Sequence, residues 1–293
     1  MTKVTLSSYY IKIVVLCLLF TIPLHNRNLY SSASKEGESA TPSLTLSYKG
    51  GREDKLFKYE GESLKYKVSF WLFKNAGLAA FKCEREGDSI VVTIDVTTTG
   101  FLDKIVHRHN IYKTTMKIEG ETNRLIPIIS YKKKIKGEKE KVMITSYDYV
   151  NNVREYKVLR NGIIHKKETL ELEPAVRDDP ISAAYNFRNE IYGRVADGAS
   201  FEIPAAYKDK TSNYKFDVYS ADNSVEYSGW DKIDGVKFAV EIDVNPDVID
   251  SKKGRLIVLY TKDLVPVGFI AKDIIGFGNL YGFRIKDIKR LKK

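Results

Sequence analysis

Three histidines are the residues whose type and spacing come closest to a chemical site. His107 and His109 are two positions apart, so both rings would face the same side of a strand, and His165 could supply a third ligand. A protein zinc site needs at least three ligands and groups that orient them, and this spacing provides neither. We therefore predict a hydrogen-bonded or solvated pair, with no metal and no cofactor. The alternative is a metal-dependent hydrolase.

Two adjacent carboxylates, Asp178 and Asp179, precede Pro180. Such a pair could act as acid and base, but carboxylates at the start of a helix cap its free backbone N–H groups and interact favourably with its dipole. Beyond the N-terminal segment, the sequence has no Gly-rich phosphate loop, no Gly-x-Ser-x-Gly turn and no cysteine–histidine arrangement. We predict capping for the aspartates and no enzyme activity for the chain.

Basic residues gather in two runs, one around a hairpin and one at the C-terminus. They are Lys132, Lys133, Lys134, Lys136, Lys139, Lys141, and Arg284, Lys286, Lys289, Arg290, Lys292, Lys293. Such runs commonly keep a sheet edge soluble, and Glu138 and Glu140 within the first run favour that interpretation. The alternative is contact with an anionic membrane or polysaccharide, because each basic residue near a membrane contributes about 1 kcal/mol. The candidates for this contact are Lys132, Lys133, Lys134, Lys136, Arg290 and Lys292.

Aromatic residues occupy both faces of the first expected strand. Tyr66 and Phe70 alternate on one face, while Trp71 and Phe73 interrupt the other. Such a strand is either covered on both sides or has one side that lines a cavity, and core packing is the more frequent cause. The candidates for binding a hydrophobic ligand are Tyr66, Phe70, Trp71, Tyr185 and Phe187.

The element with the clearest ends is a helix. Asp179 suits the N-cap, Pro180 the first helical position, and Gly193 the left-handed residue that follows the last turn. Apolar residues at spacings of three and four give this helix one face that can lie on a sheet. We predict one central helix near residues 180–192.

Most of the remaining sequence alternates with a period of two. Leu64 and Tyr66 share a face opposite Lys65, and Asn161-Gly162 is the strongest signal for a tight hairpin because both residues tolerate positive φ. Residues 101–106 could form one helical turn. Strands are expected at 64–72, 77–83, 90–96, 111–119, 125–135, 139–149, 153–159, 163–172, 201–207, 214–220, 225–230, 236–244, 256–260, 265–271 and 281–285. The pattern predicts a mainly β fold, with a large curved antiparallel sheet that is half-barrel or sandwich-like.

The N-terminus has the layout of a secretory signal. Lys3 and Lys12 flank an apolar run over residues 13–24, and small residues follow at 31–34. The run is shorter than the roughly 20 residues that span a bilayer. We expect residues 1–34 to be a cleaved signal peptide and the protein to be periplasmic. An uncleaved inner-membrane anchor and a cytosolic chain are the alternatives, and the residues before Cys17 are too large for a lipid anchor there.

Residues 35–55 are polar and rich in Gly, Ser and Pro, which predicts a flexible linker before a single β-rich domain at 56–293. Without the signal peptide Cys83 is the only cysteine, so we predict no intramolecular disulfide and a buried thiol. The net charge is +10, or +7 after loss of Lys3, Lys12 and Arg27. Outside the cytoplasm the available anions are phospholipids, lipopolysaccharide and acidic polysaccharide, so we expect no nucleic acid partner.

Three short motifs carry a family resemblance. They are residues 61–68 followed by Gly77, residues 179–188, and residues 259–267. With these motifs in this order, the chain resembles the bacterial exported family known as domain of unknown function 3108 over residues 57–288. The resemblance implies an envelope location and a curved sheet like the half-barrels of periplasmic lipoprotein and lipid carriers. It implies no catalytic residues.

Two functions remain open. The first is a non-catalytic module whose curved sheet shelters an acyl chain or another hydrophobic envelope molecule, an expectation that depends mainly on fold analogy. The second is a structural or interaction protein with a filled core, which binds polysaccharide or a partner protein. An apolar cavity of several hundred cubic ångström favours the first and a filled interior the second. The sequence does not indicate the oligomeric state.

Overall fold

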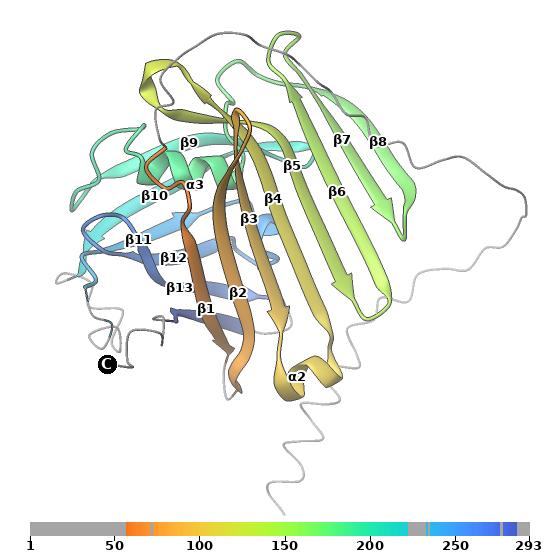
Figure 1. Cartoon of the computed structure of the whole chain (residues 1–293), viewed down its shortest axis with the longest axis vertical. Coiled ribbons are helices and arrows are strands. Elements are labelled where there is room, and N and C mark those ends of the chain that lie inside the picture. The colour runs from red at the N-terminus through yellow and green to blue at the C-terminus, as the bar shows by residue number, and fades with distance from the viewer. Residues whose placement is uncertain (1–56, 71–72, 222–232, 234, 276–277, 286–293) are drawn as a thin grey trace, which may run out of the picture. The chain divides into compact units, whose positions relative to one another are not determined.

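The fold is one continuous antiparallel sheet, shown in Figure 1. The computed structural model describes residues 57–70, 73–221, 233, 235–275 and 278–285. In that part of the chain, 14 strands pair in the linear order β8-β7-β6-β5-β4-β3-β2-β1-β14-β13-β12-β11-β10-β9, so the sheet is not closed. The prediction of a mainly β protein with a large antiparallel sheet is confirmed.

The strands alternate with short turns along the chain. Their bounds are β1 Ser63–Phe70, β2 Phe73–Glu86, β3 Ser89–Thr98, β4 Arg108–Glu119, β5 Arg124–Lys136, β6 Lys139–Asp148, β7 Val153–Arg160, β8 Ile163–Glu171, β9 Ser200–Tyr207, β10 Lys210–Ser220, β11 Phe238–Asp243, β12 Arg255–Tyr260, β13 Pro266–Ile274 and β14 Gly278–Arg284. The helices are α2 Gly100–Ile105, η1 Gly120–Thr122, α3 Pro180–Arg188 and α4 Pro246–Ile249. The expected helical turn at 101–106 is therefore α2.

The first strand and the last one lie side by side in the middle of the sheet. β1 pairs with β14 in the register Val68↔Gly282, which leaves a first arm, β1–β8, and a second arm, β9–β14. The predicted alternation in β1 is confirmed, because Leu64 and Tyr66 are buried while Lys65 is exposed. Asn161 and Gly162 both have positive φ, as expected for the tight turn between β7 and β8.

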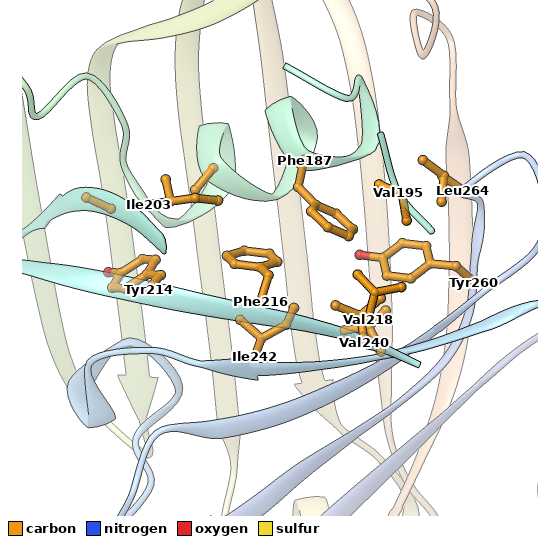
Figure 2. Close-up of a cluster of buried hydrophobic side chains, with 13 residues drawn as sticks. Phe187, Val195, Ile203, Tyr214, Phe216, Val218, Val240, Ile242, Tyr260 and Leu264 are labelled. Atoms are coloured by element: carbon orange, nitrogen blue, oxygen red, sulfur yellow. The ribbon is translucent and has the colours of Figure 1, made fainter. Parts of the chain in front are cut away.

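Helix α3 lies between the two arms and contacts β4, β5 and β9. Ala183 and Phe187 pack on the second arm, while Tyr185 packs on the first. Figure 2 shows Phe187 pointing from α3 towards Phe216 and Tyr260, and the ring centroids of Phe187 and Phe216 are 5.0 Å apart. The structure therefore corrects the expectation of a single apolar face, because α3 is buried on both sides.

The helix begins where the sequence indicates and ends one turn early. Asp179 is the N-cap, its side chain forms a capping box with Ser182, and Pro180 follows it. Asn189 is the C-cap, and Glu190 takes the left-handed conformation with φ of 56°. The structure therefore corrects the expected stop at Gly193. Gly193 lies beyond the helix with φ of 133°.

The two edges of the sheet are covered differently. The segment before α3 covers β9, because the backbone N–H of Ala206 donates to the carbonyl of Asp178. Side chains of the first arm reach the β9–β10 turn: Arg154 donates to the carbonyls of Lys208 and Lys210, and Lys166 pairs with Asp209. Polar side chains thus join the arms where the backbone does not.

Several predictions fall outside the described residues. They concern the signal peptide (1–34), the linker (35–55), the strand at 225–230, and the side chains of Trp71, Arg290 and Lys292. Among the residues that the structure describes, no helix has the length and apolar character needed to cross a membrane.

Candidate functional site

Two hollows lie between the arms, and Tyr112 of β4 lines both. We name them the Phe70 hollow and the Lys132 hollow after one residue in each. Helix α4 contributes Ile249 to the first hollow and Val248 to the second. The hollows are therefore neighbours, and the differences between their walls indicate what each can do.

The Phe70 hollow has a volume of about 160 Å³ and is half open. Apolar side chains from β1, β2, β3, α2, α4, β13 and β14 form most of its wall: Val68, Phe70, Ala76, Val96, Leu102, Ile249, Ile274 and Leu280. A dry apolar cavity of about 150 Å³ holds a benzene ring, whereas pockets for whole small molecules span roughly 300–1,000 Å³. The Phe70 hollow can therefore take a ring or a short stretch of acyl chain, and no complete lipid.

One side of the Phe70 hollow is polar. Arg108, Asn110 and Asp250 line it, and Lys134 Nζ lies 2.5 and 2.6 Å from the two carboxylate oxygens of Asp250. Burial lowers the pKa of the Arg108 guanidinium, and the nearby Asp250 carboxylate opposes that shift. Because guanidinium groups bind carboxylates and phosphates, this side of the hollow suits the polar end of an amphipathic molecule.

The Lys132 hollow is smaller and its polar groups are bonded. Its volume of about 60 Å³ leaves room for a few water molecules. Lys132 Nζ donates to Tyr207 Oη at 2.7 Å and to the carbonyl of Val248 at 3.1 Å, and it lies 4.6 Å from the ring centroid of Tyr112. Burial, followed by repulsion from Lys134, lowers the pKa of the Lys132 ammonium. These contacts fix Lys132 in place.

Helix α4 is held by ion pairs to both arms, through Lys208 in the β9–β10 turn of the second arm and Lys134 on β5 of the first arm. Lys208 pairs with Asp247 at 2.7 Å, and Lys134 pairs with Asp250. Asn245 caps the backbone N–H of Asp247 at 3.0 Å. Gly254 closes the loop with φ of 78°, and a Cβ there would lie 1.9 Å from the carbonyl oxygen of Val244. This loop therefore requires glycine.

Asp179 has the capping role that we predicted, whereas Asp178 does not cap the helix and accepts hydrogen bonds from side chains instead. Asp179 Oδ1 accepts the N–H groups of Ile181 and Ser182, while its Oδ2 accepts the hydroxyls of Thr114 and Ser130. Asp178 pairs with Arg124, and burial raises the pKa of its carboxyl. Donors therefore occupy both buried carboxylates.

A second buried ion pair anchors the other end of α3. Arg188 is 3% exposed and donates to both carboxylate oxygens of Glu62, with Nη2 2.5 Å from Oε1. Its Nε donates to the carbonyl of Leu264 at 2.9 Å. Arg188 therefore joins the start of β1, α3 and the loop before β13. Cys83 is buried nearby as predicted, and desolvation raises the pKa of its thiol to about 12.

Three of the predicted ligand-binding aromatics lie in the core. Tyr66 packs edge-on against Phe81 and Phe269, and Tyr185 and Phe187 fill the space on either side of α3. Of the described candidates, Phe70 alone lines one of these two hollows. The period-two pattern identified buried positions on the strands. It cannot show whether a buried side chain packs against other side chains or faces an empty hollow.

The basic run on β5 is divided between the two faces of the strand. Lys132 is only 6% exposed, so the structure corrects its expected role as a surface contact. Lys134 pairs with Asp250 on the same face, and Lys133 pairs with Glu140 at 2.6 Å. Alternation along a strand sends Lys132 and Lys134 inwards. Lys136 is exposed.

The histidines do not converge. His107 Nδ1 lies 2.9 Å from Asp103, and His109 Nε2 lies 2.9 Å from Asp95. His165 is in β8, the edge strand at the end of the first arm. Within the described ranges, no cluster of three or more His, Cys, Asp or Glu side chains could hold a metal.

Sequence reasoning missed Arg108, Tyr112, Tyr207 and Asp250. No local signal marks them, because Lys134 and Asp250 are 116 positions apart and the arms meet only in the folded chain. The alternation along β4 and β5 could have indicated which side chains face inwards. It could not have identified the opposite wall.

Comparison with known proteins gives a family and a distant likeness. The model of the family described as "Protein of unknown function (DUF3108)" matches residues 65–281. A crystal structure of a β-barrel-like protein of domain of unknown function DUF1849 from Brucella abortus aligns with a TM-score of 0.46 and 13% identity, over 76% of this chain and 95% of that one. None of the curated proteins matches.

Proposed function

This chain belongs to the DUF3108 family of proteins of unknown function, and we propose that it is an exported, non-catalytic envelope protein that binds the apolar part of an amphipathic molecule. The Phe70 hollow carries the proposal, because it combines an apolar wall with a polar side and is half open. The signal-like order of residues at the N-terminus supports export to the periplasm.

The size of the hollow limits the ligand. About 160 Å³ accepts one aromatic ring or the end of an acyl chain. The rest of the molecule stays outside, since α3 and its packed aromatics occupy the space between the arms. Arg108 favours a ligand whose polar end is a carboxylate or phosphate. A medium-chain fatty acid is the simplest molecule with both features.

Native mass spectrometry with decanoate tests the proposal. We expect one bound decanoate, and we expect Val96→Phe to abolish binding because its ring would fill the Phe70 hollow. Met143→Phe places the same ring at the Lys132 hollow and should leave binding intact. Far-UV circular dichroism and thermal melts confirm that both variants are folded. Unchanged binding by Val96→Phe, or a folded wild-type chain that binds no decanoate, would contradict the proposal.

A second candidate function has its own support. Helix α3 and its packed aromatics fill much of the space between the arms, and the Lys132 hollow holds only about 60 Å³. These observations favour a structural or interaction protein that holds polysaccharide or a partner protein. If organic extracts of protein purified from the periplasm contain no lipid and added fatty acids do not bind, this second function becomes the better account.

A further inference from the structure

Apolar side chains are exposed around the mouth of the Phe70 hollow. On α2, Phe101 is 67% exposed and Ile105 51% exposed, and Ile275 beyond β13 is 57% exposed. Leu102, between the two α2 residues, and Ile274, next to Ile275, line the hollow. The segments that form its wall therefore present large apolar groups to the outside, where burial would be favourable.

Exposed lysines surround these apolar groups. Lys104 is on α2 itself, and Lys136 and Lys139 flank the β5–β6 turn. That turn adjoins α2, because the N–H of Gly137 donates to the carbonyl of His107 at 3.0 Å. Lys74 is exposed next to Asn75, whose carbonyl accepts the hydroxyl of Thr99 just before α2.

Few acidic groups offset these lysines. The acid on α2, Asp103, accepts one hydrogen bond from the hydroxyl of Thr98 and lies 2.9 Å from His107 Nδ1. Glu138, in the β5–β6 turn, and Asp273, near the end of β13, are exposed, and Lys272 beside Asp273 is half-exposed. The surface around α2 thus combines exposed apolar side chains with a surplus of positive charge. This is the combination by which peripheral proteins bind anionic bilayers.

We propose that this surface, consisting of α2 with the β5–β6 turn and the end of β13, docks on an anionic phospholipid bilayer. Phe101 and Ile105 enter the boundary between headgroups and acyl chains, while Lys104 and Lys136 contact the phosphates. The orientation also brings the mouth of the Phe70 hollow to the membrane. The docking itself does not depend on a ligand in that hollow, so it can be tested separately from the proposed function.

A fluorophore attached at one position tests the docking. Because the apolar run at residues 13–24 could bind vesicles by itself, the measurement must report on α2 alone. Full-length protein carrying Cys17→Ser and Phe101→Cys is labelled with an environment-sensitive dye, and the buried Cys83 stays unlabelled. The matched control carries the dye through Val150→Cys. Val150 is 89% exposed in the β6–β7 turn, at the other end of the strands.

We expect a blue shift of the dye at position 101, and none at 150, when vesicles of phosphatidylglycerol and phosphatidylcholine in equal parts are added. Lys104→Glu together with Lys136→Glu should weaken partitioning, measured by the dye at 101, by about thirtyfold or more. Each lysine near an anionic membrane strengthens binding by about fivefold, and the two effects multiply. Added salt should weaken it as well.

Several results would overturn the docking. They are an unchanged dye at 101, equal shifts at 101 and 150, and an equal shift on vesicles of phosphatidylcholine alone. A blue shift without vesicles that grows with protein concentration would show that a second copy covers α2 instead. Loss of decanoate binding with intact docking would refute only the proposed function.

Discussion

The Phe70 and Lys132 hollows share Tyr112 and the same short helix, yet their walls differ in kind. In the Lys132 hollow the buried ammonium has acceptors and aromatic rings around it, and Asp179 on the opposite wall is fully bonded. The Phe70 hollow has mostly apolar walls and exposed apolar neighbours. Space bordered by satisfied polar groups stabilises the fold, whereas open apolar space is available to a ligand.

This difference predicts opposite consequences for variants in the two hollows. Changes around the Lys132 hollow should alter stability and leave ligand binding unaffected. Changes around the Phe70 hollow should alter binding.

Asp179→Ala should have the largest effect on stability. The variant loses the N-cap of α3 and leaves the hydroxyls of Thr114 and Ser130 without their acceptor, so we expect a loss of about 3 kcal/mol. Urea unfolding followed by circular dichroism measures it. Asp148→Ala, in an exposed turn, is the control and should cost much less. Decanoate affinity should not change. If the folded variant also lost affinity for decanoate, the two hollows would be functionally coupled, contrary to the distinction drawn here.

Leu102→Ala should enlarge the Phe70 hollow. Loss of the Leu102 side chain from the wall should lower the free energy of unfolding by about 2 kcal/mol. This is at the low end for a buried leucine, because the hollow is already half open. In return, the variant should bind a longer or bulkier acyl chain than the wild type does. Native mass spectrometry over a series of fatty acids measures this preference. Met143→Ala, which enlarges the Lys132 hollow, should lose stability with no change in the preferred ligand.

Lys132→Met should change the pH dependence of stability more than stability itself. Burial lowers the pKa of Lys132 in the folded state below its usual 10.5, so the folded chain binds fewer protons than the unfolded chain in that interval. The free energy of unfolding contributed by Lys132 therefore rises with pH, from the lowered pKa up to about 10.5. Denaturant titrations at a series of pH values in this range should show that the free energy of unfolding rises less with pH for Lys132→Met than for the wild type. Parallel slopes would mean that Lys132 is not desolvated.

The smallest expected effect is at Cys83, which adjoins neither hollow. Its burial and its pKa of about 12 keep the thiol protonated and inaccessible. A thiol reagent applied to the Cys17→Ser protein at neutral pH should react only as fast as the chain unfolds. The same rate measures the integrity of the first-arm core in each variant above. Rapid labelling of folded protein would contradict the packing described for β2.

Local features of this fold were predictable from the sequence. The alternation along β1, the Asn161-Gly162 turn and the Asp179 cap each depend on neighbouring residues and were correctly assigned. The end of α3 was not correctly assigned, because Glu190 rather than a glycine adopts the left-handed conformation. Propensity disfavours that choice, and the hydrogen bond from the N–H of Val195 to the Glu190 side chain depends on the path of the loop that follows the helix.

The candidate site was predictable only in part. Phe70 was identified by its alternation, but Tyr66 has the same alternation and is packed in the core, as are Tyr185 and Phe187 on α3. Lys132 was assigned to a surface because lysines are seldom buried. Its burial follows from the approach of α4, which lies more than 100 positions away. Pairing of β1 with β14 determines that approach, and no local pattern encodes it.

The measurement that tests the central distinction most directly is an NMR titration of the methyl groups with decanoate. If the account is correct, the methyl signals of Val96, Leu102 and Leu280 shift saturably, those of Met143 and Val248 do not, and Val96→Phe removes the response. If no methyl signal shifts, or if the shifts are centred on Met143, the Phe70 hollow is not the ligand site and the two hollows do not differ as proposed.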